Sequence, residues 1–101
     1  MKKILLLCAA GMSTSLMVKK MTEAAEKKGI EVEIKAIGLE KFQENLDAYD
    51  VFLLGPQVKY KKAELEKIAA TVGKKVEVIN TVDYGMMRGD KVLDFALGLM
   101  G

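Results

Sequence analysis

Two short stretches of the chain are apolar at every position, and two others carry polar residues. Residues 4–7 (ILLL) and 51–54 (VFLL) contain no polar side chain, which is typical of strands covered on both faces of a parallel sheet. Residues 31–36 (EVEIKA) alternate polar and apolar positions, and residues 76–79 (VEVI) are short and contain one glutamate, as expected of edge strands. The pattern therefore predicts four strands, two inside the sheet and two at its edges.

Between the strands, apolar residues recur at every third or fourth position, which is the period of an amphipathic helix. Residues 80–89 lack this period and are predicted to form a loop. Hydroxyl and carboxylate side chains are candidate N-caps, and glycines are candidate C-caps. The predicted helices cover residues 16–28, with Ser13, Thr14 and Ser15 before it and Gly29 after it; a short segment within 39–46; residues 65–72, ended by Gly73; and residues 90–100, capped by Asp90.

Strands that alternate with helices require right-handed crossovers, which produce a parallel sheet. With the apolar strands inside, the predicted architecture is a single open α/β sheet of order 2-1-3-4, with helices on both faces. The chain has 101 residues, of which 50% are hydrophobic, so residues 1–101 are expected to form one domain around one core. Ligands of open α/β sheets bind where the strand order reverses, which is here between strands 1 and 3.

Cys8 stands at this point, between the first strand and the first long helix. Unpaired N–H groups of the loop and the helix dipole stabilise an anion there, including a thiolate. The sequence contains no histidine, so covalent chemistry falls on Cys8 or on a hydroxyl. Cys8 is therefore predicted to be a nucleophile that receives a phosphoryl group, without a metal or other cofactor in the chain. The predicted phosphate cradle is Ala9, Ala10, Gly11, Met12, Ser13, Thr14 and Ser15.

Three other interpretations of these residues stay open. Cys8 could be a buried inert cysteine before an ordinary helix, because free cysteine is often buried. The segment could bind an anion or a partner without turnover. It could also belong to a small phosphotyrosine phosphatase with the pattern C-x5-R-S/T, although Thr14 occupies the arginine position and Arg88 is the first arginine. Thr14→Arg is then expected to leave phosphate binding intact and to favour hydrolysis.

Four residues after strands 3 and 4 could border the same site or be ordinary turn and cap residues. They follow strand ends that the predicted sheet places beside Cys8. These possible rim residues are Gln57, Tyr60, Asp83 and Tyr84.

The charge and the cysteine content of the chain indicate which partners it binds and in which cellular compartment it is expected. The net charge of +2 is distributed along the chain, so no nucleic-acid surface is expected. A single cysteine cannot form an internal disulfide, which suggests an intracellular protein with a free thiol. The apolar run before Cys8 is shorter than the apolar region of a secretory signal or a membrane helix.

Three stretches of the chain match a known pattern: ILLLCAAGMSTSLMVKKM (4–21), VFLLGPQVKY (51–60) and VDYGMMRGDKVLDFAL (82–97). They resemble the IIB components of the sugar phosphotransferase system, in the lactose/cellobiose/chitobiose class. The similarity implies that Cys8 takes a phosphoryl group from a phosphohistidine on a IIA protein. It also implies transfer to a sugar, such as cellobiose, chitobiose or lactose, bound by the membrane component IIC, and hence a cytoplasmic protein that meets the inner face of the membrane through IIC.

Overall fold

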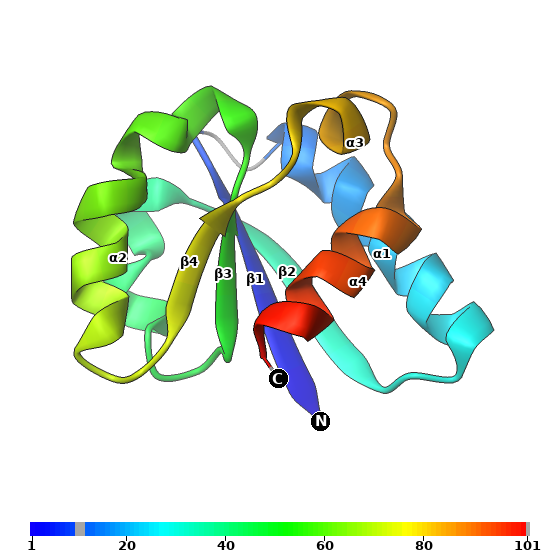
Figure 1. The fold of residues 1–101 in the computed structure, drawn as a ribbon, viewed down its shortest axis with the longest axis horizontal. Coiled ribbons are helices and arrows are strands. Elements are labelled where there is room, and N and C mark those ends of the chain that lie inside the picture. The colour runs from blue at the N-terminus through cyan, green and yellow to red at the C-terminus, as the bar shows by residue number, and fades with distance from the viewer. Residues whose placement is uncertain (10–11, 101) are drawn as a thin grey trace.

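The computed structural model describes residues 1–9 and 12–100, with the side chains of Met12 and Ser13 left out. The described strands form one parallel sheet of order β2-β1-β3-β4 (Figure 1), so the predicted fold and strand order are confirmed. The boundaries of β1, β2 and β4 differ from the prediction by one or two residues. The strands are β1 (Lys2–Cys8), β2 (Val32–Gly38), β3 (Val51–Leu54) and β4 (Lys75–Val78).

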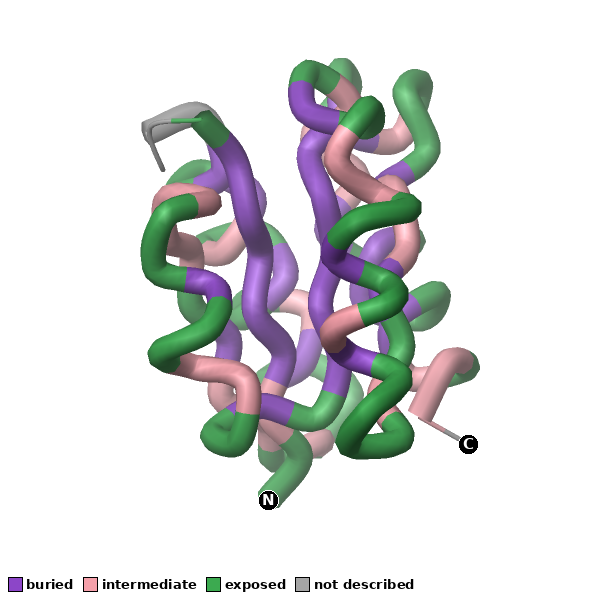
Figure 2. Tube along the Cα trace, turned by 90° about the vertical axis from the view of Figure 1, so that its left-hand side faces the viewer, coloured by how far each residue is buried: buried purple, intermediate pink, exposed green. Residues whose placement is uncertain are grey.

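Helices cover both faces of this sheet, as predicted. Side chains on alternate positions of β1 and β3 point to opposite faces, so Leu6 and Leu53 pack under α1 and α4, while Leu7 and Leu54 belong to the cluster on the α2 face. The buried residues follow the strands through the middle of the molecule (Figure 2). The helices are α1 (Met12–Lys28), α2 (Lys62–Ala70), α3 (Thr81–Gly85) and α4 (Gly89–Leu99), with 3-10 turns η1 (Leu39–Lys41), η2 (Gln43–Asn45) and η3 (Pro56–Lys61).

The segment predicted as a loop contains the short helix α3. The side-chain oxygen of Asn80 accepts hydrogen bonds from the backbone N–H groups of Val82 and Asp83 at 2.9 and 3.0 Å, which caps the helix at its start. A helix of 5 residues is too short to show a helical period in the sequence. The loop prediction was therefore wrong, and Asn80 was the only local signal for α3.

Three helices begin earlier than predicted. α2 starts at Lys62, three residues before its predicted start, and ends at Ala70. α1 starts at Met12, so Thr14 and Ser15 lie inside its first turn and are not N-caps. α4 starts at Gly89, so Asp90 is also inside the helix, where its negative charge favours the positive end of the helix dipole. The segment after β2 forms η1 and η2 in place of one short α-helix. Gly29 and Gly73 have φ of 69° and 71°, which confirms them as left-handed C-caps.

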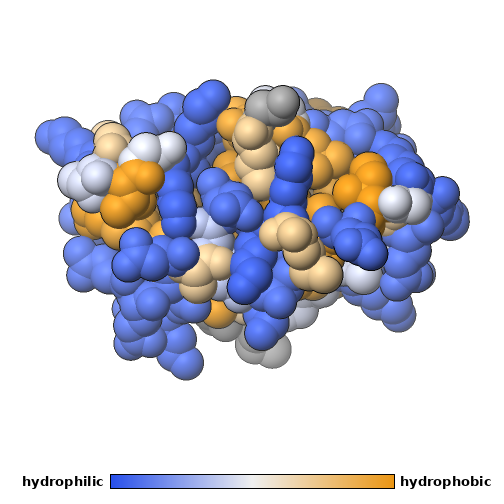
Figure 3. All heavy atoms as spheres, turned by 90° about the horizontal axis from the view of Figure 1, so that it is seen from below, coloured by the Kyte–Doolittle hydropathy of each residue, from blue (hydrophilic) through white to orange (hydrophobic). Residues whose placement is uncertain are grey.

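The two ends of the sheet differ in character. Both chain termini lie at the amino ends of the strands (Figure 1), and hydrophilic residues cover much of the surface there, with hydrophobic residues between them (Figure 3). Cys8 lies at the opposite end, where the strands finish. Within the described part of the chain, every helix is too short or too polar to cross a bilayer.

Tyr49, a buried residue just before β3, is expected to make the stability of the folded protein fall at alkaline pH. Burial and the negative charge of Glu33, which also accepts a hydrogen bond from the phenol, raise the pKa of Tyr49 above its ordinary value of 10.0. The folded protein thus favours the neutral phenol. The stabilisation from Tyr49 is fully present below the pKa that this phenol has in the unfolded chain. It is lost as the pH rises through the higher pKa that the phenol has in the folded protein.

We expect the wild-type protein to be about 1 kcal/mol more stable than Tyr49→Phe near neutral pH, because phenylalanine loses this hydrogen bond. The difference should shrink above pH 10.0. Thermal melts of both proteins across this range would measure it, and a difference that does not change with pH would contradict the expectation.

Candidate functional site

Cys8 is the last residue of β1, between the carboxyl ends of β2 and β3. It pairs in register with Gly38 of β2, while β3 lies on the other side of β1. The chain leaves β1 toward α1 on one face and leaves β3 toward η3 and α2 on the other face. The strand order therefore reverses at Cys8, and its predicted position at the topological switch point is confirmed.

The sulfur of Cys8 has a hydroxyl donor in direct contact. Strand alternation places the side chain on the α1 face, and the Oγ1 of Thr14 donates a hydrogen bond to Sγ at 3.4 Å. Cys8 is 4% exposed and Thr14 is 0% exposed. A hydroxyl donor stabilises negative charge on sulfur, and the first turn of α1 contributes the positive end of its dipole. Thr14 thus contacts the Cys8 sulfur from the buried interior of the protein.

The burial of Thr14 bears on one expectation from the sequence. An arginine at this position would have to place its guanidinium in a space with no exposed surface or push α1 away from the sheet. The burial of Thr14 therefore argues against the expectation that Thr14→Arg leaves phosphate binding intact, which stays a prediction. Thr14 occupies the arginine position of the phosphatase pattern in sequence, but its side chain points into the protein.

We expect Thr14→Val to slow alkylation of Cys8 by iodoacetamide by about tenfold, because valine keeps the buried volume and removes the hydrogen bond that the Thr14 hydroxyl donates to sulfur. Thr22→Val is the matched control, since Thr22 is an exposed threonine on the same helix. Alkylation rates measured by mass spectrometry give the comparison. Equal rates for the two variants would show that the Thr14 hydroxyl does not support the thiolate.

The structure covers the predicted phosphate cradle only in part. Ala9 and Ser15 are exposed, and Thr14 is buried. Ala10 and Gly11 lie outside the described residues, as do the side chains of Met12 and Ser13. Residues 9–15 as a phosphate cradle therefore stay a prediction.

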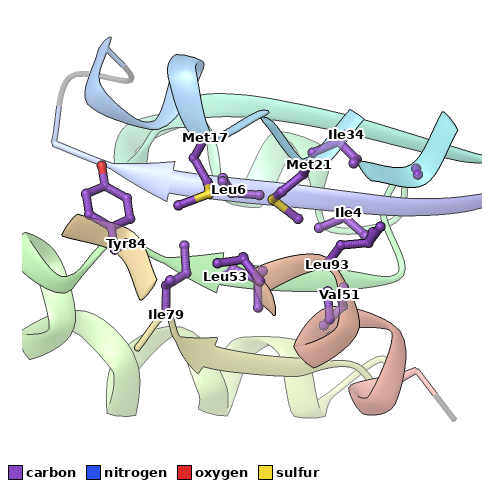
Figure 4. Close-up of a cluster of buried hydrophobic side chains, with 13 residues drawn as sticks. Ile4, Leu6, Met17, Met21, Ile34, Val51, Leu53, Ile79, Tyr84 and Leu93 are labelled. Carbon is purple, nitrogen blue, oxygen red and sulfur yellow. The ribbon is translucent and has the colours of Figure 1, made fainter. Parts of the chain in front are cut away.

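The four possible rim residues have different environments. Gln57 and Tyr60 are exposed on η3, which follows β3. Asp83 forms an ion pair with Arg88 at 3.4 Å, so its carboxylate faces the connection between α3 and α4. Tyr84 is buried in the α1-face core near Met17, and its hydroxyl points toward the end of β1 (Figure 4). Tyr84 therefore contributes mainly to the core.

A surface hollow of about 400 Å³ beside Ala9 was not predicted. Glu40 folds back over Gly38, the register partner of Cys8, and brings a carboxylate to this hollow. Lys61 and Glu64 form an ion pair at 3.0 Å, and Glu64 raises the pKa of Lys61. The hollow is lined by residues that follow β1, β2 and β3. Its only signal in the sequence was the prediction that the ends of these three strands lie side by side. Its lining is Ala9, Leu39, Glu40, Lys61, Glu64 and Leu65.

This fold and site define a class: small, open α/β proteins with a cysteine at the switch point, before the N-terminus of a helix. Residues 3–95 match the family model described as "PTS system, Lactose/Cellobiose specific IIB subunit". The chain belongs to this family. It is thus a phosphotransferase of the sugar phosphotransferase system, and the resemblance seen in its sequence is confirmed.

Individual relatives are similar over nearly the whole chain. It is 49% identical over 100 residues to the oligo-beta-mannoside-specific EIIB component of Bacillus subtilis (strain 168), covering 99% of this chain and 97% of the relative. It is 49% identical over 104 residues to the galactose-specific EIIB component of Lactococcus lactis subsp. cremoris (strain MG1363), covering 98% and 96%. The solution structure of a cellobiose-specific phosphotransferase IIB component protein from Borrelia burgdorferi matches with a TM-score of 0.82 at 43% identity, covering 98% of this chain and 91% of that chain.

Proposed function

We propose that Cys8 accepts a phosphoryl group from a phosphohistidine on a IIA partner and transfers it to a sugar bound by a membrane IIC partner. The observation that carries this proposal is the position of the sulfur at the switch point, directly before α1 and in contact with the Thr14 hydroxyl. A strand end next to a helix N-terminus is where both a thiolate and a phosphoryl group are stabilised.

Two in-line displacements at phosphorus describe the reaction. In the first, a sulfur lone pair forms the S–P bond while the N–P bond of the phosphohistidine breaks, and the released imidazole takes a proton. In the second, a sugar hydroxyl oxygen forms the O–P bond, the S–P bond breaks, the thiolate returns, and the hydroxyl proton passes to a base outside this chain. Because the sequence has no histidine, the phosphohistidine belongs to the partner. Positioning and electrostatic stabilisation supply most of the catalysis of such steps.

The proposed phosphate cradle uses neutral donors from residues 9–15. The N-terminus of α1, a helix of 17 residues, carries about half a positive charge, which favours the phosphoryl oxygens. The segment contains no arginine to clamp the group for attack by water. We expect this arrangement to hold a phosphocysteine long enough for a second protein to receive the phosphoryl group.

Exposed apolar side chains around this end of the sheet support docking of a protein partner. They lie on α1, on η3, and on α3 or directly after it, in the segments that follow β1, β3 and β4 at the end of the sheet where Cys8 lies (Figure 1). Large exposed apolar residues grouped at one end of a small protein are typical of an interaction surface. These residues are Leu16, Tyr60, Val82 and Met86.

The sugar is proposed to be a β-linked disaccharide, such as cellobiose, chitobiose or lactose. Two relatives with the same 49% identity are named for oligo-beta-mannoside and for galactose, which supports selection of the sugar outside this chain, by IIC. The proposed place of action is the cytoplasm, at the inner face of the membrane when the protein meets IIC.

Incubation with a phosphorylated IIA donor, followed by mass spectrometry of the peptide that contains Cys8, tests the proposal. A persistent adduct of one phosphate on Cys8 supports a phosphoryl carrier. Rapid release of inorganic phosphate would instead indicate a thiol phosphatase, and absence of an adduct would indicate a module that only binds an anion or a partner.

A further inference from the structure

Gly55 leaves open a space next to the candidate nucleophile, and the side chain of Gln57 fills it. Gly55 follows β3, is buried, and donates its N–H to the carbonyl oxygen of Leu7 at 2.9 Å. A Cβ on residue 55 would lie 2.8 Å from Oε1 of Gln57 and 3.7 Å from Cγ2 of Thr14. The carboxamide of Gln57 and the methyl group of Thr14 therefore border the same small volume.

Backbone conformation does not explain the glycine. Gly55 has φ of −63° and ψ of 149°, an extended conformation that residues with a side chain adopt readily. The contacts at 3.7 Å to Thr14 and to the Leu7 carbonyl oxygen are ordinary van der Waals contacts. Of the close contacts that a Cβ would make, only the one to Gln57 is too short, so the absence of a side chain at residue 55 leaves room for this carboxamide.

The location of Gln57 relative to Cys8 suits a group that touches a bound phosphoryl. Thr14 relates the two, since its methyl group and the Gln57 carboxamide both lie within 4 Å of the position that a Cβ on Gly55 would take, and its hydroxyl contacts the Cys8 sulfur. Thr14 is fully buried, whereas Gln57 is exposed. Gln57 thus lies at the carboxyl end of β3, beside the switch point, with its side chain accessible to a bound group.

We propose that the Gln57 carboxamide donates a hydrogen bond to the phosphoryl group during its transfer to and from Cys8. The proposal rests on the proposed function of Cys8. A carboxamide has two N–H donors and no charge, so it orients a phosphoryl oxygen by a neutral hydrogen bond. This neutral donor fits a site whose loop has threonine at the position where the phosphatase pattern has arginine.

The first test compares three variants with a phosphorylated IIA donor at saturating concentration. Gln57→Ala should slow formation of the phosphocysteine by about tenfold or more, since a donor aimed at developing charge is lost. Gln57→Glu should slow it at least as much, because a carboxylate repels the phosphoryl oxygens. Gln43→Ala, at an exposed glutamine on η2, is the matched control and should react at the wild-type rate. Thermal melts should agree for all three variants.

The second test uses Gly55→Ala, which displaces the Gln57 carboxamide without removing it. Gly55→Ala should slow phosphorylation in the wild-type background and should have no further effect in the Gln57→Ala background. Gly98→Ala is the control for the substitution itself, because a Cβ on Gly98 meets nothing within 4 Å.

Two results would overturn the role of Gln57: wild-type rates for Gln57→Ala, or an equal loss from Gly55→Ala in both backgrounds. Failure of the underlying function is a separate result, because the wild-type protein itself would then carry no phosphate on Cys8. The two failures are therefore distinguished by the wild-type sample in the same experiment.

Discussion

Cys8→Ser is expected to lower the rate of phosphoryl transfer by at least about a thousandfold while the protein stays folded. Serine has nearly the shape of cysteine, and its oxygen can still accept the hydrogen bond that Thr14 donates to Sγ. A serine hydroxyl is not ionised near neutral pH, and the chain has no histidine to remove its proton. The variant should therefore keep the fold and lose the nucleophile.

Formation of sugar phosphate with complete IIA and IIC partners, together with a thermal melt, measures both parts of this expectation. Thr22→Val, on the exposed side of α1, should transfer phosphate at the wild-type rate and confirms that the assay tolerates a substitution on this helix. Transfer by Cys8→Ser at a rate close to that of the wild-type protein would exclude Cys8 as the phosphoryl carrier. An unfolded variant would be recognised by its melt and would call for Cys8→Ala.

Gly89→Ala is expected to lower the free energy of unfolding by about 1–3 kcal/mol, as overpacking of a tight contact usually does. Gly89 is the buried first residue of α4, where this helix crosses α1. A Cβ at this position would lie 2.6 Å from the carbonyl oxygen of Lys20, which belongs to the backbone of α1. Relief would require a shift of α1 against α4, and these helices together cover one face of the sheet.

The melting temperature should fall by roughly 4–8 °C for each kcal/mol lost in a domain of this size. Gly98→Ala is the matched control on the same helix, because its Cβ would meet no neighbour and alanine favours helix more than glycine. Its melting temperature should stay the same or rise slightly. Equal melting temperatures for the two variants would contradict the close contact between α1 and α4.

The hydrophobic pattern was sufficient to predict the architecture, because the number of buried faces of a strand determines which of its residues are apolar. Residues 4–7 and 51–54 are apolar throughout because helices cover both faces of β1 and β3. Residues 31–36 alternate because β2 lies at an edge of the sheet. These differences set the strand order, and the order places the cysteine at the end of β1 on the switch point.

Local patterns were weaker at the ends of helices. The hydroxyl residues before position 16 have the chemistry of N-caps, yet α1 begins at Met12 and takes Thr14 into its first turn. The five residues of α3 are fewer than two helical turns, so no period could show in them. Both differences arise because helix boundaries depend on how the segment packs against the rest of the protein.

The sequence by itself determined the fold class, the position of Cys8 at the switch point and the family, since these depend on strand burial and on residues close together in the chain. The tertiary structure decided which side chains meet there. Thr14 points inward to the sulfur, and Gln57 occupies the space that Gly55 leaves open. Thr14, which follows β1, and Gly55, which follows β3, also come together across two strand ends. These distances depend on packing, which a linear pattern of residue types does not contain.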